Sequence, residues 1–331
     1  MPSFFRKLSW LVVGISCCLL LVTAVCFTWQ PERFAAFTVM PIWLWGGLGL
    51  LLSSVACWFF RARLALLVTA LWVVTVLVGA DEARVLGNLG KSPPLPGPAA
   101  PEHGRTVLRV VTLNCSSFRY GDPANDLAGW QPDILLVQEA FPYQVRRLAD
   151  ALFAGRGEFR CHDTNGIITR WHIDRDVATP GRRDQQATIL LPNGSKLEVV
   201  NIHLASAATD LRLWQRDAWR NHRTNRASRS LELAGALQTL AQTTNPSATP
   251  TLVGGDFNSP ASDPVHRLLD RDFSDAFTAA GTGWGDTFQR RVPILRIDRL
   301  YATRHLTPVR CRAVTTRTSD HRLVVADFLT P

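Results

Sequence analysis

The sequence predicts a layered α/β domain that follows a membrane region of three helices. Three charge-free apolar runs, at residues 8–31, 34–60 and 64–80, fill most of the first eighty residues. From residue 106 onward, short β-branched runs alternate with turn residues and amphipathic stretches. The sequence contains no G-x-G-x-x-G or Walker motif, so we expect neither a dinucleotide-binding nor a P-loop domain.

The apolar runs match the length of membrane helices. A bilayer core about 30 Å thick is crossed by roughly 20 apolar residues of helix, a length that the third run only approaches. We expect helices at about residues 8–29, 39–60 and 64–80. A cleaved signal peptide is the alternative for the first run, because Arg6 and Lys7 precede it. Two further apolar runs follow at short spacing without a clean small-x-small cleavage site, which favours the membrane helix.

The positive-inside rule gives the expected orientation. Basic residues stand before the first run, at positions 6 and 7, and between the second and third runs, at positions 61 and 63. The loop between the first two runs carries only Arg33, which Glu32 offsets. Three crossings then give a multi-pass protein of the cell inner or plasma membrane, with everything after Ala80 outside the cytoplasm. If the third run does not span, this sidedness inverts.

The composition excludes two classes of protein. Lys and Arg number 36 against 27 Asp and Glu, and charged residues are only 19% of the chain, which does not fit a disordered charged tail. Seven cysteines in 331 residues are too few for a disulfide scaffold. Cys115, Cys161 and Cys311 follow the apolar runs and leave one disulfide open, while the lack of a C-x-x-C argues against zinc or redox chemistry.

A proline-rich stretch separates the membrane region from the α/β domain. Five prolines fall within residues 91–101, which makes this segment a semi-rigid spacer rather than a helix or strand. We therefore expect a membrane region at 1–90, a linker at 91–105 and a folded domain at 106–331. The last of these is long enough to bury a core of its own.

Eight strands and one long helix are expected in the folded domain. The strands are residues 106–113, 133–138, 166–169, 187–191, 197–203, 250–254, 296–302 and 323–328. The helix covers residues 211–243. Its expected apolar stripe consists of Leu231, Leu233, Ala234, Leu237 and Leu240.

Polar residues stand at the ends of several of these apolar runs. They are Asn114, Gln138 with Glu139, Asn201 with His203, Asp256 with Asn258, and Asp320 with His321. Residues two apart in a strand face the same side, so Asp256 and Asn258 are expected to converge, as are Asn201 and His203. These side chains are therefore candidates for one shared site.

Each of these residues also has an ordinary explanation when it is taken alone. Asn114 could end a strand in a turn, Glu139 could be a solvated loop acid, and residues 255–260 could form an Asx turn. Together, however, such side chains are costly to bury without a shared partner. Carboxylate and amide oxygens without cysteine suit Mg²⁺ or Mn²⁺, and do not suit structural zinc.

The same residues resemble the endonuclease/exonuclease/phosphatase superfamily, which includes deoxyribonuclease I, neutral sphingomyelinases and inositol-polyphosphate 5-phosphatases. The likeness covers about residues 106–329 and keeps seven motifs in order. The motifs are Leu-Asn at 113–114, Gln-Glu at 138–139, Gly-Ile-Ile-Thr-Arg at 166–170, Asn-x-His-Leu at 201–204, Gly-Asp-x-Asn at 255–258, Arg-Ile-Asp at 296–298 and Ser-Asp-His at 319–321. The resemblance implies a four-layer sandwich of two mixed β-sheets flanked by helices, with an active site along one rim.

The resemblance implies that the protein hydrolyses phosphate esters with the help of a metal ion. It also implies which residues would bind that ion. Glu139 would be the principal direct ligand of a Mg²⁺ or Mn²⁺ ion. Asn114 and Asp320 would assist it. The ion would neutralise charge that develops on a phosphate oxygen.

The resemblance also implies a set of catalytic residues. Asp256 would position or deprotonate the attacking water, and Asn258 would donate hydrogen bonds to phosphoryl oxygens. His321 would contact the phosphate or act as a base, and Asp298 would hold its imidazole in the correct tautomer. His203 matches the second histidine of the deoxyribonuclease, sphingomyelinase and phosphatase branches.

The helix at residues 211–243 bears on the substrate, and two interpretations stay open. Residues 212–229 hold six arginines and one acid, with Trp214 and Trp219 between them. Four of the arginines are spaced to share one helical face, namely Arg212, Arg216, Arg220 and Arg223. Such a ridge could hold a nucleic-acid backbone through its phosphates. A solvated helix, or one lying near anionic headgroups, explains the same residues.

Three hypotheses for function follow from the sequence. The first, which the sequence favours, is a membrane-anchored, nuclease-like phosphodiesterase. The alternative is a sphingomyelinase-like or inositol-phosphatase-like hydrolase of lipid headgroups. The third, from another class, is a non-catalytic membrane receptor for phosphorylated ligands, to which a catalytically silent family member would also correspond. The sequence indicates no oligomeric state.

Overall fold

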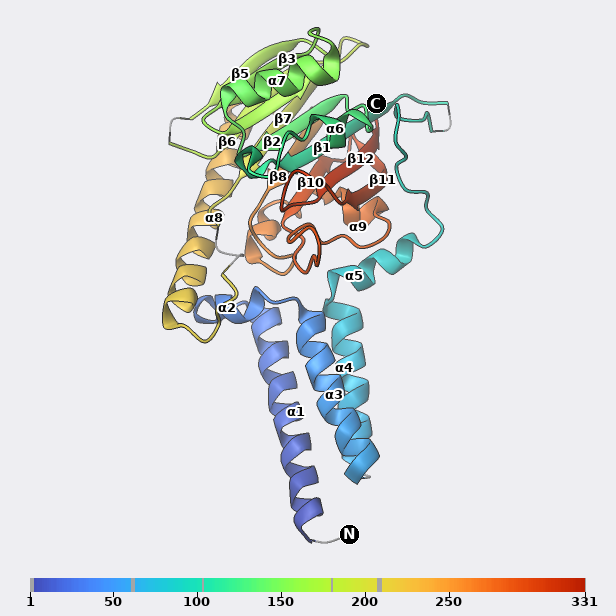
Figure 1. The fold of residues 1–331 in the computed structure, drawn as a ribbon, viewed down its shortest axis with the longest axis vertical. Helices are drawn as coiled ribbons and strands as arrows, with labels where there is room; N and C mark the ends of the chain where they lie inside the picture. Colours follow the sequence, from blue (N-terminus) through green and yellow to red (C-terminus); the bar gives the residue numbers. More distant parts are fainter. Residues whose placement is uncertain (1–2, 61–62, 103, 180, 207–209, 331) are drawn as a thin grey trace.

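The computed structural model describes residues 3–60, 63–102, 104–179, 181–206 and 210–330. The molecule has a helical stalk at the N-terminal end and a two-sheet domain above it (Figure 1). Arg61, one of the basic residues on which the expected orientation rests, lies outside the described residues. The two parts meet through the short helices that join the stalk helices to each other and to the domain.

Three long helices form the stalk, close to the expected ranges. They are α1 (Ser3–Trp29), α3 (Ile42–Phe60) and α4 (Arg63–Gly79). Among the described residues, one helix, Lys7–Trp29, is by itself long and apolar enough to cross a membrane. The other two reach that length only together with a short helical segment bent by 72°, which is Glu32–Thr38 before α3 and Asp81–Asn88 after α4. The stalk therefore holds one candidate span, or up to three if each bent pair is one span.

Small residues let the stalk helices approach each other closely. A side chain added at Gly49 of α3 would collide with the ring of Trp72 on α4. Trp72 is fully buried, and its Nε1 donates a hydrogen bond to Oγ of Ser16 on α1, at 3.0 Å. All three helices thus pack around one indole ring, in the manner of small-residue interfaces between membrane helices.

Four short helical elements follow the stalk helices. Two of them join α1 to α3, and the other two lead from α4 to the domain. They are η1 (Glu32–Phe34), α2 (Ala35–Thr38), α5 (Asp81–Arg84) and η2 (Val85–Asn88). The proline-rich segment then runs along the domain surface and is bound to it. Arg109 Nη1 donates to the carbonyl oxygens of Leu95 and Gly97, at 2.8 and 2.6 Å, and Arg310 Nη2 donates to that of Ala100, at 2.6 Å.

Two mixed, six-stranded sheets make up the domain. The first has the order β11-β12-β1-β2-β4-β3, from β1 (Val107–Asn114), β2 (Ile134–Gln138), β3 (Glu158–His162), β4 (Asn165–Thr169), β11 (Thr307–Val314) and β12 (Leu323–Leu329). The second has the order β5-β6-β7-β8-β10-β9, from β5 (Ile173–Ala178), β6 (Asp184–Leu190), β7 (Lys196–His203), β8 (Thr251–Asp256), β9 (Phe273–Asp275) and β10 (Asp298–Thr303). Among these described strands, β1 with β2 and β7 with β8 pair in parallel, and the other pairs are antiparallel.

The alternation of apolar residues builds a four-layer sandwich. In β1, Val110 faces the core between the two sheets, whereas Val111 faces the outer core beneath the helices α6 (Ala124–Ala128) and α7 (Pro142–Phe153). A third core lies between the second sheet and the long helix α8 (Arg216–Thr243). Strands buried on both faces read as continuous apolar runs, which is why the sequence identified them. The expected four-layer sandwich is confirmed.

The eight expected strands are present, but four others were missed. The missed strands are β3, β5, β9 and β11, and each lies at an edge of its sheet. Edge strands are half-exposed and carry charged residues or proline, so their sequences lack the apolar runs of central strands. In β11, for example, Pro308, Arg310 and Arg312 interrupt the pattern. The amphipathic helix α7 was also missed.

The expected apolar stripe of the long helix was right in part: Leu233, Leu237 and Leu240 pack on the core beneath the helix, and the other two members do not. The helix begins at Arg216 rather than at residue 211, and Leu231 and Ala234 of the expected stripe are exposed. The buried face runs instead through His222, Arg226, Arg229, Leu233, Ala236 and Leu240, at alternating spacings of three and four. Two arginines and a histidine lie on this face, so a stripe defined by apolar residues alone could recover only its C-terminal part.

The cysteines form no disulfide. All seven are free thiols, and Cys115 and Cys311 are buried in different hydrophobic cores of the domain. The disulfide that the sequence left open is therefore not made.

Candidate active site

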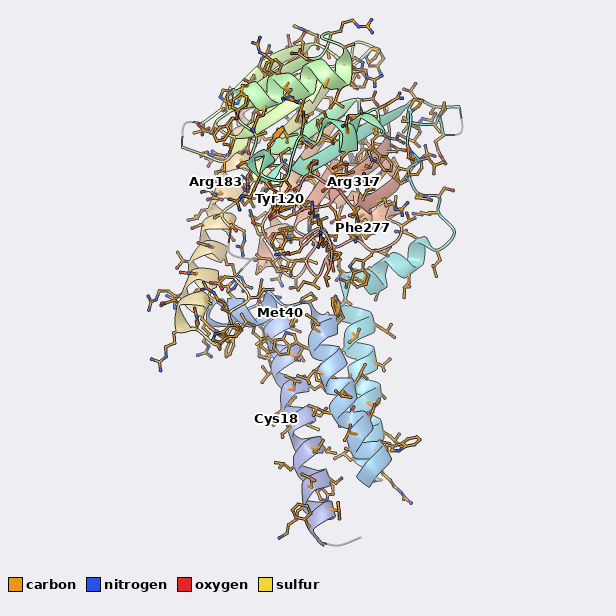
Figure 2. All side chains as sticks on the ribbon, in the orientation of Figure 1. Cys18, Met40, Tyr120, Arg183, Phe277 and Arg317 are labelled. Atoms are coloured by element: carbon orange, nitrogen blue, oxygen red, sulfur yellow. The ribbon has the colours of Figure 1, made fainter. Side chains whose placement is uncertain are left out.

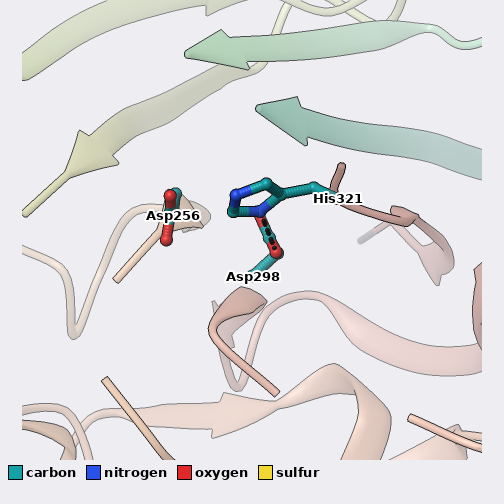
Figure 3. Close-up of side chains that lie close together, drawn as sticks. All are labelled: Asp256, Asp298 and His321. Carbon is teal, nitrogen blue, oxygen red and sulfur yellow. Dashed lines mark hydrogen bonds and ion pairs between the residues drawn. The ribbon is translucent and has the colours of Figure 1, made fainter. Parts of the chain in front are cut away.

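The pairing of the strands brings their polar ends to one rim of the sandwich. Within the first sheet, Asn114 of β1 lies beside Gln138 of β2. Within the second sheet, Asp256 of β8 lies between His203 of β7 and Asp298 of β10. Figure 3 shows Asp256, Asp298 and His321 converging on one point from separate segments.

Asn114 joins the two sheets across the site. Its Nδ2 donates to Oε1 of Glu139 at 3.0 Å and to Oδ2 of Asp256 at 2.9 Å. Its Oδ1 accepts the amide of Ser116 at 2.9 Å, and the side chain is buried. Glu139 follows β2 in a left-handed conformation, with φ of 51°, and its side chain remains 38% exposed. An ion or substrate entering from solvent can therefore reach the Glu139 carboxylate.

His321 and Asp298 form a buried pair. Nδ1 of His321 lies 2.9 Å from Oδ2 of Asp298, and both side chains are almost fully enclosed. Burial alone lowers the pKa of an imidazole, but Asp298, with Asp256 and Asp320 nearby, raises the pKa of His321 to about 10. The imidazole is thus held as a cation with Nδ1 engaged, which leaves Nε2 as the free donor.

Asp256 is the second buried acid of the site. Burial, together with the neighbouring Asp298 carboxylate, raises the pKa of Asp256 above its ordinary value. Ligand atoms of Asp256, Asp298 and His321 lie within 4.8 Å of one another, which is close enough for a metal centre. Within this cluster, Nδ1 of His321 is engaged by Oδ2 of Asp298 at 2.9 Å, so these two residues form a hydrogen-bonded pair.

His203 and Asn258 border the two acids. Nε2 of His203 lies 3.7 Å from Oε1 of Glu139 and 4.0 Å from Oδ2 of Asp256. Asn258 has a φ of 49°, and its amide nitrogen donates to Oδ1 of Asp256 at 2.8 Å. Its side-chain Nδ2 donates to the carbonyl oxygen of Leu204 at 3.0 Å, which ties it to the end of β7.

Asp320 reaches the site through serines. Ser116 Oγ donates to Oδ1 of Asp320 and lies 2.8 Å from Oγ of Ser319. Ser319 Oγ in turn donates to the carbonyl oxygen of Asn114, at 2.6 Å. The loop that carries Asp320 and His321 is thus fixed against the end of β1.

All eight residues singled out from the sequence lie along this rim. They are Asn114, Glu139, His203, Asp256, Asn258, Asp298, Asp320 and His321, and each is linked to another of the set by a hydrogen bond, an ion pair or a bridging serine. Gln138 and Asn201 have a structural part instead. Gln138 Nε2 donates to Oδ1 of Asn201 at 2.6 Å, which joins the two sheets behind the site.

Sequence reasoning missed two supporting hydroxyl groups. Thr287 Oγ1 accepts the amides of Ile297 and Asp298, at 3.2 and 3.1 Å, and so holds the start of β10. Ser116 connects Asn114 to Asp320 as described above. Neither residue interrupts an apolar run or belongs to a quoted motif, so the sequence offered no signal for them.

The donor types around Glu139 fit a hard divalent cation. The accessible groups are carboxylate and amide oxygens, which Mg²⁺ and Mn²⁺ prefer. The adjacent thiol of Cys115 is turned into the outer core, where burial raises its pKa. No sulfur ligand among the described residues competes for the site.

The fold and the site together define the class of protein to which this chain belongs. Two mixed six-stranded sheets between helices, with buried acids, amides and histidines at one rim, are the arrangement of a phosphoester hydrolase. The family model described as "Endonuclease/Exonuclease/phosphatase family" matches residues 111–321, which is more than half of the chain. The chain belongs to this family, and the expected hydrolase class is confirmed.

Solved structures share the fold at low identity. A humanized D. rerio TDP2 is 19% identical, with a TM-score of 0.53 over 68% of this chain and 99% of its own. An endonuclease/exonuclease/phosphatase family protein from Bacteroides thetaiotaomicron is 14% identical, with a TM-score of 0.56 over 69% of this chain and 99% of its own. A mannosyl-6-phosphatase of that species is 15% identical, with a TM-score of 0.53 over 67% and 99%. A search of curated proteins finds no match.

Proposed function

We propose that this chain is a membrane-anchored, divalent-metal-dependent phosphodiesterase that acts on phosphate groups carried by lipids at the membrane surface. The observation that carries this proposal is the contact between the active site and the stalk. Val39, just after α2, shares a buried hydrophobic cluster with Phe288, and the Phe288 ring lies 5.1 Å from that of His321. Met40, at the junction of stalk and domain in Figure 2, packs on the same cluster.

Polar contacts hold this junction in place. Arg226 of α8 is buried and donates to Oγ1 of Thr38 at 2.5 Å and to the carbonyl oxygen of Gln30 at 3.4 Å. Ser262 Oγ donates to the carbonyl oxygen of Thr38 at 3.3 Å. The catalytic rim is thus fixed close to the stalk ends, where a lipid headgroup would present its phosphate.

The proposed anchoring follows the sequence analysis. We propose that α1, α3 and α4 all cross the bilayer, which gives a membrane region at 1–90, a linker at 91–105 and a catalytic domain at 106–331 on the extracytoplasmic side of the inner or plasma membrane. The glycine contacts around Trp72 and the basic ends of the stalk support this arrangement. Accessibility of single introduced cysteines to a membrane-impermeant thiol reagent tests it in whole cells.

The site residues have distinct parts in the proposed reaction. Glu139, with Asn114 and Asp320, would hold a Mg²⁺ or Mn²⁺ ion, which supplies positive charge to a phosphate oxygen when bound. Asp256 would orient the attacking water and accept its proton, and the raised pKa of its buried carboxyl supports the role of base.

Two histidines and one amide complete the proposed reaction. Asp298 fixes Nδ1 of His321, so Nε2 is the atom that donates to a phosphate oxygen. His203 approaches the same centre from β7, beside Asp256. Asn258 would donate its remaining amide hydrogen to the phosphate.

The test uses the full chain in lipid nanodiscs, with Mg²⁺ or with EDTA. Substrates are phospholipid vesicles, sphingomyelin vesicles, soluble inositol phosphates and plasmid DNA. We expect release of a phosphorylated headgroup in Mg²⁺ and none in EDTA, and a loss of about 10²-fold or more in His321→Ala. Full activity of His321→Ala would remove that residue from the mechanism, and binding without turnover of every substrate would favour the receptor hypothesis.

A nucleic acid is the second candidate substrate. Arg216, Arg220 and Arg223 are exposed on α8, and a D. rerio TDP2 of the same fold is complexed with a single-strand DNA product. The ridge is smaller than the sequence suggested, because Arg226 and Arg229 are buried beside Asp263 and Arg212 precedes the helix. DNA cleavage that weakens steeply with salt and ignores vesicles would favour this candidate.

A further inference from the structure

A second cavity lies away from the active site, between the upper ends of the stalk helices and the second sheet. Its volume is about 800 Å³, which is within the range of small-molecule sites. The stalk side is apolar and includes Phe27, Ile42 and Val78, while the domain side includes Asp286 and Arg299. None of the eight residues of the candidate active site is among the described residues that line it.

The two buried arginines on the domain side are already neutralised. Arg296 donates to Asp275 at 2.8 Å and to Asp81 at 2.8 Å, and Arg299 donates to Asp275 at 2.8 Å. These two guanidinium groups and two carboxylates balance each other. A further buried acid beside them is not balanced within this group of four.

Glu82 and Asp286 are the further acids in the cavity. Asp286 is 3% exposed, and its Oδ2 accepts no hydrogen bond from the described residues. Burial, with Glu82 nearby, raises the pKa of Asp286 to about 8, and burial raises that of Glu82 as well. Arg296 and Arg299 offset the rise at Asp286 only in part, and Glu82 accepts one hydrogen bond, from Nε1 of Trp43 at 3.1 Å. A buried acceptor without a donor costs free energy until a donor reaches it.

We propose that this cavity binds the headgroup of an aminophospholipid from the surrounding bilayer, with its primary ammonium group on Asp286 and Glu82. An ammonium supplies both the missing charge and the missing N–H donor. The exposed Arg84 and Arg267 line the mouth and suit the lipid phosphate, and the apolar stalk side suits acyl chains. A choline headgroup has no N–H, so the site should discriminate against it. This inference rests on the proposed membrane anchoring and not on the proposed activity.

Native mass spectrometry of the full chain, released from detergent micelles, tests this proposal. The probes are short-chain phosphatidylethanolamine, short-chain phosphatidylcholine and free phosphoethanolamine. We expect one phosphatidylethanolamine to bind per chain, with affinity roughly tenfold or more above that of phosphatidylcholine, the value of one charge-assisted hydrogen bond. Asp286→Asn should remove this preference, and Glu82→Gln should reduce it. Asp272→Asn, a neighbouring exposed acid that does not line the cavity, is the matched control.

Several outcomes would overturn the proposal. If the wild-type chain bound the two lipids equally well, the ammonium group would not contribute to lipid recognition. Unchanged selectivity in Asp286→Asn and Glu82→Gln would place the lipid elsewhere, and Glu82→Gln keeps the test decisive if Asp286→Asn does not fold. Free phosphoethanolamine bound as tightly as the lipid would exclude the bilayer as its source. Hydrolysis by the catalytic site is not measured, so failure here leaves the proposed function standing.

Discussion

Thr287 Oγ1 accepts the backbone amide of Asp298, at 3.1 Å, and the amide of Ile297 next to it. The carboxylate that orients His321 is therefore positioned by a hydroxyl group eleven residues earlier in the chain. The same segment also holds the loop before β12, because the amide of Arg322 donates to the carbonyl oxygen of Thr287 at 2.8 Å. One threonine thus supports both members of the buried pair.

We expect Thr287→Val to impair both stability and catalysis. Valine keeps the shape but leaves two buried amides without an acceptor, which should cost about 1–3 kcal/mol of unfolding free energy. A shift of Asp298 should also lower kcat by roughly tenfold or more. Thermal unfolding and steady-state kinetics measure the two effects, and Thr287→Ser should restore them. Wild-type values for Thr287→Val would show that the hydroxyl has no supporting part.

Glu139→Gln should weaken metal binding. Its carboxylate is the accessible acid at the rim, and a neutral amide is a poorer ligand for Mg²⁺. We expect the affinity for Mg²⁺ to fall by more than the roughly 10–100-fold that follows when a residue hydrogen-bonded to a metal ligand is removed. Calorimetric titration with Mg²⁺ measures this directly, with Asp272→Asn as a control on total charge. An unchanged affinity would exclude Glu139 as the principal ligand.

Trp214→Ala should separate lipid from nucleic-acid substrates. This side chain is 79% exposed just before α8, where an indole can lie at the membrane interface. We expect lower activity on phospholipid vesicles and unchanged activity on a soluble phosphodiester. Parallel assays on the two substrates make the comparison. A variant equally active on vesicles would speak against interfacial action of this loop.

Arg229→Ala should destabilise the domain much more than Arg223→Ala. Arg229 is buried, and its Nη2 donates to Oδ2 of Asp263 at 2.7 Å, whereas Arg223 is exposed on the same helix. Loss of the buried cation should cost about 3 kcal/mol, because Asp263 loses its closest partner. The exposed substitution should stay within about 0.5 kcal/mol. Thermal unfolding of the two variants decides between buried pairing and a surface ridge.

Gly49→Ala should loosen the stalk, and Gly47→Ala should not. A methyl group at Gly49 would collide with the ring of Trp72, while the space around Gly47 is open. Overpacking of this kind costs about 1–3 kcal/mol. Alanine at Gly47 should be neutral or slightly stabilising, since it favours the helix. Thermal unfolding of the full chain in detergent compares the two, and equal behaviour would contradict the close packing.

The sequence predicted the central strands of both sheets but not the strands at their edges. Val110 and Val111 belong to a continuous apolar run because both faces of β1 are buried, so the central strands were recognisable. Edge strand β11 carries Arg310, which pairs with Asp327 at 3.0 Å, and such partners are invisible before the chain folds. Arg226 could not be recognised as a buried residue for the same reason, since its partners in the stalk lie almost 200 residues away.

The candidate site was predictable where a polar residue ended an apolar run. Asn114 and Asp256 were found in this way, and the structure joins them by a hydrogen bond of 2.9 Å. Thr287 lies in an irregular segment and Ser116 begins the short 3-10 helix η3 (Ser116–Phe118), and neither segment carries such a contrast in composition. Positions that act through backbone amides or bridging hydroxyls therefore need coordinates to be recognised.

The tie between Arg226 and Thr38 sets how a bilayer-held enzyme of this kind would meet its substrate. If the stalk is held in a bilayer as proposed, a domain fixed to it cannot swing out into bulk solution, so encounters with a lipid substrate would occur by lateral diffusion within the leaflet. Turnover would then follow the mole fraction of substrate in the surface, and diluting that surface with inert lipid would slow the reaction even at constant total substrate.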